Sequence, residues 1–152
     1  MALNFTGYQQ SKSPRSGHNE LLVRVGPGTA CGEYLRRFWQ PIIMTSEIGD
    51  LPVAIRRFGE DLVVFRDGLG RYGLTHRNCP HRNASLEFGR IEQRGIRCCY
   101  HGWHYDIDGT LLDAPAEPPE ARLAQRIRLG AYPCREYKGL VFAYLGPSED
   151  QP

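Results

Sequence analysis

The stretch that decides the fold covers residues 79–103 and reads CPHRNASLEFGRIEQRGIRCCYHGW. A first short motif, Cys79-Pro80-His81, opens it, and a second, Cys98-Cys99-Tyr100-His101, lies near its end. Thiolate and imidazole are ligands suited to soft and borderline metal ions, and each motif supplies one of each. If the two motifs fold against each other, they present two cysteines and two histidines. The sequence therefore predicts a metal site whose ligands are Cys79, His81, Cys98 and His101.

The order of these ligands distinguishes two kinds of site. A single tetrahedral zinc site usually pairs Cys with Cys at two-residue spacing and His with His at three to five, which is not the spacing found here. Cys-x-His followed, after an excursion, by Cys-x-x-His is the arrangement of a Rieske centre, a [2Fe-2S] cluster with two Cys on one iron and two His on the other. The sequence favours the cluster, and a structural zinc module is the remote alternative.

The remaining cysteines and histidines need a separate assignment. Counting from Cys99 would give a second Cys-x-His motif with a shortened loop, so we assign Cys98 as the ligand. We expect Cys99, Cys31 and Cys134 to behave as small buried hydrophobes. His76 and His104 are expected to be surface or strand histidines, since four ligands are already present. Trp103 either shields the site or belongs to the core.

The residues around both motifs closely resemble the cluster-binding loops of Rieske non-haem iron oxygenases, the aromatic-ring-hydroxylating enzymes. The similarity covers roughly Val23 to Pro147 and includes the Asp108-Gly109 turn, the Pro115 to Pro119 segment and the ending Gly139 to Pro147. Asn83 replaces a common Gly of the family, a change that a left-handed backbone tolerates. The resemblance implies an all-β Rieske (ISP-like) fold: an antiparallel β-sandwich with partial barrels, a short N-terminal helix and a small cluster-binding subdomain at about 76–112.

The resemblance also distinguishes between Rieske subtypes. Cytochrome bc1-type proteins carry an additional disulfide at positions that correspond to Ala84 and Tyr100, and Ser in place of Trp103. This chain resembles instead the oxygenase and ferredoxin group, at the lower end of the Rieske range of roughly −150 to +300 mV. The implied function is one-electron transfer, with a flavin or iron-sulfur reductase or a ferredoxin as the electron donor.

Residues 28–41 resemble the first helix and strand of phthalate-oxygenase-like α subunits, which stand-alone Rieske ferredoxins usually lack. The chain is therefore expected to be the electron-accepting domain of a ring-hydroxylating dioxygenase or monooxygenase, with a stand-alone ferredoxin-like carrier as the alternative. The acceptor would be a mononuclear-iron domain, which in the family lies in a neighbouring subunit of a homotrimer. Because the chain ends at Pro152, we expect that iron site to be absent from it, and whether the chain is itself an enzyme stays open.

Composition sets limits on the remaining possibilities. The chain has 152 residues, 41% of them hydrophobic, enough for one domain at 20–152 preceded by a flexible arm at 1–19. The net charge is only +2 and the 19 basic residues are dispersed, so nucleic acid is not an expected partner. No apolar run is long enough for a membrane span and residues 1–14 are polar, so we expect a cytoplasmic protein.

Local patterns predict short strands joined by Gly-containing turns over most of the chain. Thr29 can cap a short helix that buries Leu35 and Phe38 and exposes Arg36 and Arg37. The segment Leu21 to Val25 is strand-like. The expected strands are Pro41 to Met44, Val53 to Phe58, Leu62 to Arg66, Tyr72 to Thr75, Gly95 to Cys99, Ile127 to Tyr132 and Leu140 to Leu145.

Overall fold

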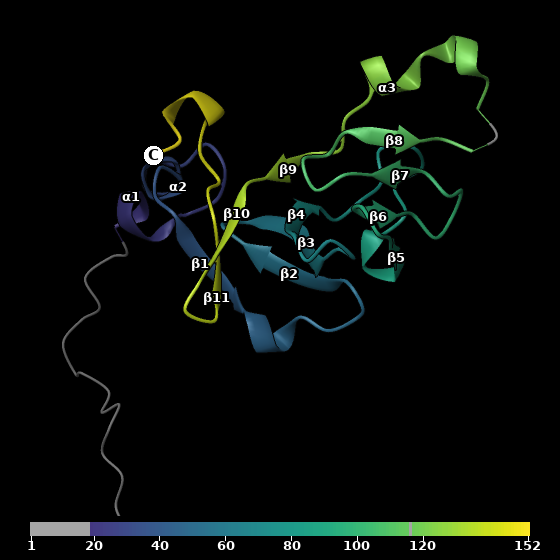
Figure 1. Cartoon of the computed structure of the whole chain (residues 1–152). Coiled ribbons are helices and arrows are strands. Elements are labelled where there is room, and N and C mark those ends of the chain that lie inside the picture. Colours follow the sequence, from purple (N-terminus) through teal and green to yellow (C-terminus); the bar gives the residue numbers. More distant parts are fainter. Residues whose placement is uncertain (1–18, 116) are drawn as a thin grey trace, which may run out of the picture.

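The computed structural model describes residues 19–115 and 117–152 (Figure 1). Strands dominate it, which confirms the predicted all-β class. The predicted arm at 1–19 lies outside the described residues except for Asn19, which accepts a hydrogen bond from Leu21 N and caps the first helix. The α-helices are α1 (Glu20–Val23), α2 (Ala30–Arg36) and α3 (Leu123–Arg126), and short 3-10 turns lie at Thr45–Glu47, Leu86–Phe88, Pro119–Ala121 and Ser148–Asp150.

The strands form three antiparallel sheets in the described part of the chain. The first has the order β1 (Gln40–Met44), β11 (Leu140–Ala143), β10 (Cys134–Tyr137). The second has the order β2 (Val53–Arg57), β3 (Glu60–Arg66), β4 (Tyr72–His76), β9 (Ala131–Tyr132). The third has the order β5 (Arg90–Ile91), β6 (Ile96–Arg97), β7 (His104–Tyr105), β8 (Leu111–Asp113).

Strand β3 is the centre of the molecule because both of its faces are buried. Side chains alternate across a strand. Leu62 and Val64 pack with residues of the β1-β11-β10 sheet, whereas Val63 and Phe65 pack with residues of the β5–β8 sheet. All four are fully buried. The alternation explains why Leu62 to Phe65 is a continuous apolar run, and it joins the three sheets through one strand.

The β5–β8 sheet belongs to an excursion from the second sheet. The chain leaves this sheet after β4 and returns at β9, which pairs with β4 through Leu74 opposite Tyr132 and Thr75 opposite Ala131. We call the described residues between them, 77–115 and 117–130, the inserted lobe. Figure 1 shows the lobe on the opposite side of the molecule from α1 and α2. The lobe contains all four predicted ligands.

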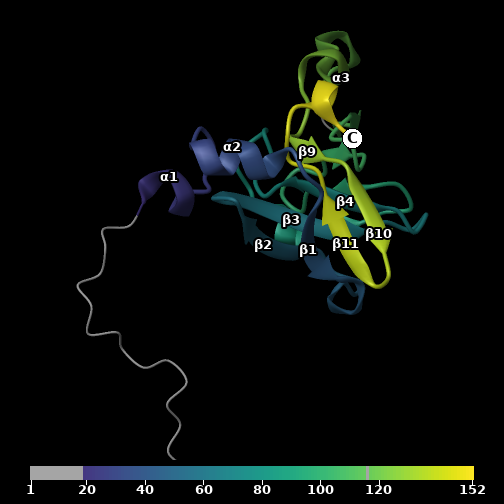
Figure 2. The ribbon, with the colours of Figure 1, turned by 90° about the vertical axis from the view of Figure 1, so that its left-hand side faces the viewer.

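The region before β1 differs from two expectations. The predicted strand at Leu21 to Val25 is wrong: residues 20–23 form α1, which is followed by α2 outside the sheets (Figure 2). Thr29 caps α2 as predicted, since its side chain accepts a hydrogen bond from Gly32 N. No helix within the described residues is long and apolar enough to span a membrane.

The burial predicted around α2 is wrong at Arg36 and Phe38, whereas Arg37 is exposed as expected. Arg36 is only 5% exposed, while Phe38 is 48% exposed. The Arg36 guanidinium forms an ion pair with Glu60 and donates to Phe58 O at 2.7 Å, so the turn between β2 and β3 pairs its charge, while its Nε has no hydrogen-bond partner among the described residues. A buried arginine is tolerated when it is paired in this way.

Candidate functional site

The first predicted ligand motif forms a tight loop directly after β4. Cys79 N donates to Ala84 O and Asn83 N donates to Cys79 O, both at 2.9 Å. Asn83 has a φ of 59°, so the left-handed conformation that we expected this residue to tolerate is present. These bonds close the loop at its base and place His81 at its turn.

The second motif forms a matching loop between β6 and β7. Cys98 N donates to Trp103 O at 2.8 Å, and Gly102 N donates to Cys98 O at 3.1 Å. Gly102 has a φ of 75°, which glycine adopts without steric strain. Arg97 adds a hydrogen bond from its guanidinium to Gly102 O at 2.6 Å. The two loops thus have the same design, with a backbone hydrogen-bond pair below a left-handed turn residue.

The structure brings the four predicted ligands together as two pairs. Cys79 and Cys98 are 2% and 4% exposed and belong to the same core cluster beneath β3. The rings of His81 and His101 lie with their centroids 4.7 Å apart and their planes at 61°. His101 is exposed and the His81 side chain is 22% exposed. The thiols therefore lie inside the lobe and the imidazoles at its surface.

The surroundings of Cys79 determine how readily its thiol loses a proton. Burial raises the pKa of the Cys79 thiol, and the nearby Cys98 thiol adds to the rise, although the Tyr105 hydroxyl acts in the opposite direction. The Tyr105 oxygen lies 3.3 Å from Cys79 Sγ, and burial raises the pKa of this hydroxyl as well. Coordination deprotonates a thiol outright, and the buried tyrosine stays a donor to the resulting thiolate.

Two thiols and two imidazoles match the donor set of a [2Fe-2S] cluster of the Rieske type, which takes two protein ligands on each iron. Within residues 19–115 and 117–152, no three His, Cys, Asp or Glu side chains gather around a position for one ion. The residues present fit a cluster held by one pair of thiols and one pair of imidazoles.

Trp103 both belongs to the core and shields one of the predicted ligands. The indole is 3% exposed and belongs to the core cluster of the lobe. It also stacks on the His81 ring with the two planes 1° apart and the centroids at 4.4 Å. Tyr100 lies against the other histidine, His101, at 3.8 Å between centroids, and is 62% exposed.

The other cysteines and histidines lie elsewhere. Cys99 is exposed, so the expected burial of this thiol is wrong: it follows the end of β6 in a turn, where alternation across a strand no longer applies. Cys31 and Cys134 are half-buried, and burial raises the pKa of Cys134 to about 12. His76 is 52% exposed beside Glu60, as expected of a surface histidine. His18 lies outside the described residues.

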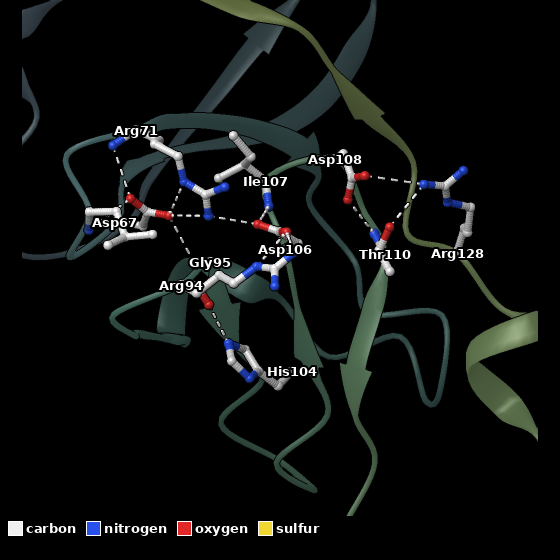
Figure 3. Close-up of polar contacts among 11 residues, drawn as sticks. Asp67, Arg71, Arg94, Gly95, His104, Asp106, Ile107, Asp108, Thr110 and Arg128 are labelled. Carbon is white, nitrogen blue, oxygen red and sulfur yellow. Dashed lines mark hydrogen bonds and ion pairs between the residues drawn. The ribbon is translucent and has the colours of Figure 1, made fainter.

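An ionic network with two buried carboxylates, which the sequence did not predict, joins the lobe to the second sheet (Figure 3). Arg71 donates to Asp67 at 2.6 Å and to Asp106 at 2.7 Å, and Arg94 donates to Asp106 at 2.7 Å. Asp67 also accepts from Gly95 N at 3.2 Å. We call Asp67, Arg71, Arg94 and Asp106 the inter-sheet network. It holds the turn after β3 against the turn that precedes β6 and the turn that follows β7.

The pKa values of the two carboxylates reflect these contacts. Burial alone would raise the pKa of Asp67, but hydrogen bonds from Arg71 and Gly95 N outweigh it and leave the pKa below its ordinary value. Burial would also raise the pKa of Asp106, but hydrogen bonds from Arg94, Ile107 N and Arg71 outweigh it and leave this pKa below its ordinary value. Both groups are therefore charged in the folded protein at neutral pH.

Comparison with known proteins gives consistent relatives. The chain is 58% identical over 134 residues to the oxygenase subunit of tert-butanol monooxygenase / tert-amyl alcohol desaturase from Aquincola tertiaricarbonis, a match that covers 88% of this chain and 28% of that protein. It is 50% identical over 137 residues to the phenoxybenzoate dioxygenase subunit alpha of Ectopseudomonas oleovorans, covering 90% and 34%. The chain thus spans about a third of the length of these curated relatives.

Among solved structures, the fold is similar to a reduced complex between oxygenase and ferredoxin in carbazole 1,9a-dioxygenase. The TM-score is 0.66 at 34% identity, and the match covers 77% of this chain and 30% of that one. Residues 38–133 match the family described as Rieske [2Fe-2S] domain, whose cluster is a one-electron carrier. Fold, donor set and comparisons agree that the chain belongs to the Rieske [2Fe-2S] domain family, resembles the Rieske domains of aromatic oxygenase α subunits, and has an electron-transfer role.

Proposed function

We propose that this domain accepts single electrons from a reductase or ferredoxin and passes them to a mononuclear-iron oxygenase domain, using a cluster held by Cys79, His81, Cys98 and His101. The observation that supports this best is the pairing of two buried thiols with two outward imidazoles. Each relative named above is an oxygenase subunit, which supports an oxygenase as the acceptor. The carbazole 1,9a-dioxygenase complex supports a ferredoxin as one class of donor.

The chain's own residues contribute three things to this function. The core around Cys79 and Cys98 excludes water from the sulfur ligands. The Tyr105 hydroxyl lies 3.3 Å from Cys79 Sγ and would donate to the thiolate formed on cluster binding, which stabilises negative charge there. The exposed ring of His101 offers a path for the electron between the site and a docked partner. When bound, the cluster supplies reversible one-electron chemistry at a potential set by these surroundings.

The ligand assignment can be tested with one pair of neighbouring variants. We expect the purified protein to contain two iron and two acid-labile sulfide per chain and, after dithionite reduction, to give a rhombic electron paramagnetic resonance signal with an average g below 2. Cys98→Ser should lose iron and signal, whereas Cys99→Ser should keep both. Zinc instead of iron in the wild type, or loss of the signal in Cys99→Ser alone, would contradict the proposal.

The oxygenase role predicts two further measurable properties, a low midpoint potential and a trimeric mass. The midpoint potential should lie in the lower part of the Rieske range, near roughly −150 mV, so that a reductase-coupled ferredoxin can reduce the domain. A potential close to +300 mV would exclude that donor class. The trimer that the resemblance implies predicts a light-scattering mass of three chains of 17.3 kDa, and a monomer at all concentrations would instead favour a stand-alone carrier.

A further inference from the structure

We propose that Glu117 lowers the reduction potential of the cluster by placing a negative charge beside His81, an inference that rests on the proposed function. Glu117 Oε1 lies 3.9 Å from His81 Nε2. Histidine ligands normally direct their outer nitrogen to a partner outside the metal site. With Nε2 facing the carboxylate, the other ring nitrogen is the one available to iron. Glu117 is thus a positioning and charge-setting residue of this domain.

The His81 ring is held in the orientation that this contact requires. Trp103 stacks on one face of the ring at 4.4 Å, and the indole is itself 3% exposed in the core. His101 meets the His81 ring edge-on at 4.7 Å between centroids. A ring packed between two such neighbours has little freedom to rotate, so Nε2 stays directed at the loop that carries Glu117.

The loop that carries Glu117 is also held in place. Glu117 N donates to Ala114 O at 3.2 Å and so closes a turn after β8. Pro115 packs against Gly102, with its Cγ 3.4 Å from the position that a Cβ would occupy there. Since Gly102 belongs to the second ligand loop, the turn that carries Glu117 rests directly on the site. Its carboxylate reaches His81 from within the same chain.

The sign of the effect follows from charge. An oxidised cluster is more positive than a reduced one, so a neighbouring carboxylate stabilises the oxidised form and lowers the potential. The Glu117 side chain is 34% exposed, so water and salt screen it in part. At 3.9 Å the two groups interact across an ion-pair distance or through one bridging water. Arg82 is the next charged residue along the chain from His81 and is exposed.

The test compares two charge-neutralising variants of the same loop. Glu117→Gln should raise the midpoint potential at pH 7, in a titration followed by the visible spectrum, by about tenfold in the one-electron equilibrium constant, or ~59 mV. The control is Glu120→Gln, which removes an equally charged, exposed side chain from the same loop and should shift the constant by less than threefold. The resonance line shape should be unchanged in both, because the ligands are untouched.

The outcomes distinguish the role of Glu117 from the proposed function of the domain. Equal potentials for Glu117→Gln and Glu120→Gln, or a fall in Glu117→Gln, would overturn the role of Glu117 and leave the cluster in place. A wild-type protein without iron and sulfide would overturn the proposed function itself. If Glu117→Gln does not load the cluster, the wild-type potential decides: it should rise with salt as the carboxylate is screened, and a salt-independent potential would overturn the inference.

Discussion

Replacing Asp106 with Asn should destabilise the folded protein by about 2–3 kcal/mol. The Asp106 side chain is 5% exposed and accepts hydrogen bonds from Arg71, Arg94 and Ile107 N at 2.7–2.8 Å. Removing one partner of a buried ion pair costs about 3–5 kcal/mol. Because the two arginine side chains are 34% and 57% exposed, water recovers part of this loss, and the lower figure follows.

Asp108 provides a matched control two residues further along the chain (Figure 3). It pairs with Arg128 at 3.2 Å, but the two side chains are 58% and 67% exposed, so Asp108→Asn should cost only about 0.5 kcal/mol. For a chain of this size each kcal/mol shifts the melting temperature by roughly 2–4 °C. We therefore expect a fall of roughly 5–10 °C for Asp106→Asn and about 1–2 °C for Asp108→Asn.

The assay is thermal unfolding of the cluster-loaded protein, followed by circular dichroism and by the visible absorbance of the cluster. All variants must be heated at one scan rate, because cluster loss makes the transition irreversible. Similar falls for the two variants would show that burial of the inter-sheet network adds nothing beyond surface charge. No fall for Asp106→Asn would refute the network as the joint between the sheets.

Three other predictions concern the same region. Tyr105→Phe removes the hydroxyl that would donate to the Cys79 thiolate, so the reduced form loses ~1 kcal/mol of stabilisation. The midpoint potential should therefore fall by roughly 40 mV. An unchanged potential in a redox titration would disprove this hydrogen bond. Burial would raise the pKa of the two carboxylates of the inter-sheet network, but hydrogen bonds outweigh it and leave the pKa lowered. Their stabilisation is therefore present above about pH 4 and is lost as the pH falls through the lower folded pKa. Melting between about pH 2 and 5 should show this loss, and Asp106→Asn should reduce the slope. Gly95→Ala places a Cβ 1.9 Å from the Tyr105 carbonyl oxygen, at a residue whose φ is 76°. It should lower the melting temperature by at least ~5 °C. Gly49→Ala is the control: its Cβ would meet no atom within 4 Å, and the melting temperature should stay within about 1 °C of the wild type.

The parts of the fold that sequence could predict are those set by local chemistry. Strands with apolar runs, Gly-containing turns and the Thr29 cap depend on neighbours in the chain, and the structure contains most of them. Two predicted strands are shorter than expected: Gly95 to Cys99 is reduced to Ile96–Arg97, and Ile127 to Tyr132 to Ala131–Tyr132. The paired ligand motifs were recognisable because residue type and spacing together restrict the metal chemistry. Asn83 in the left-handed conformation belongs to the same class of signal.

The parts that sequence reasoning missed depend on contacts between distant segments. Arg36 is buried because Glu60, from another element, is there to pair with it, and no local pattern records that partner. Similarly, Arg71 and Asp106 meet only after the lobe has folded onto the second sheet. The error for Cys99 has a different cause: the strand that was expected to bury it ends at Arg97. Charged pairs of high sequence separation become visible only in three dimensions.

The pairing of β4 with β9 places the two ends of the inserted lobe next to each other, with His76 N donating to Gly130 O at 2.8 Å. A segment that begins and finishes at adjacent hydrogen-bonded residues can open as a separate cooperative unit while the rest of the protein stays folded. Amide hydrogens of β6 and β7 should then exchange faster than those of β3 when iron is removed. The same closure would let the lobe be grafted onto another antiparallel hairpin, provided that the neighbouring strand offers an apolar face like that of Val63 and Phe65, against which the lobe packs here.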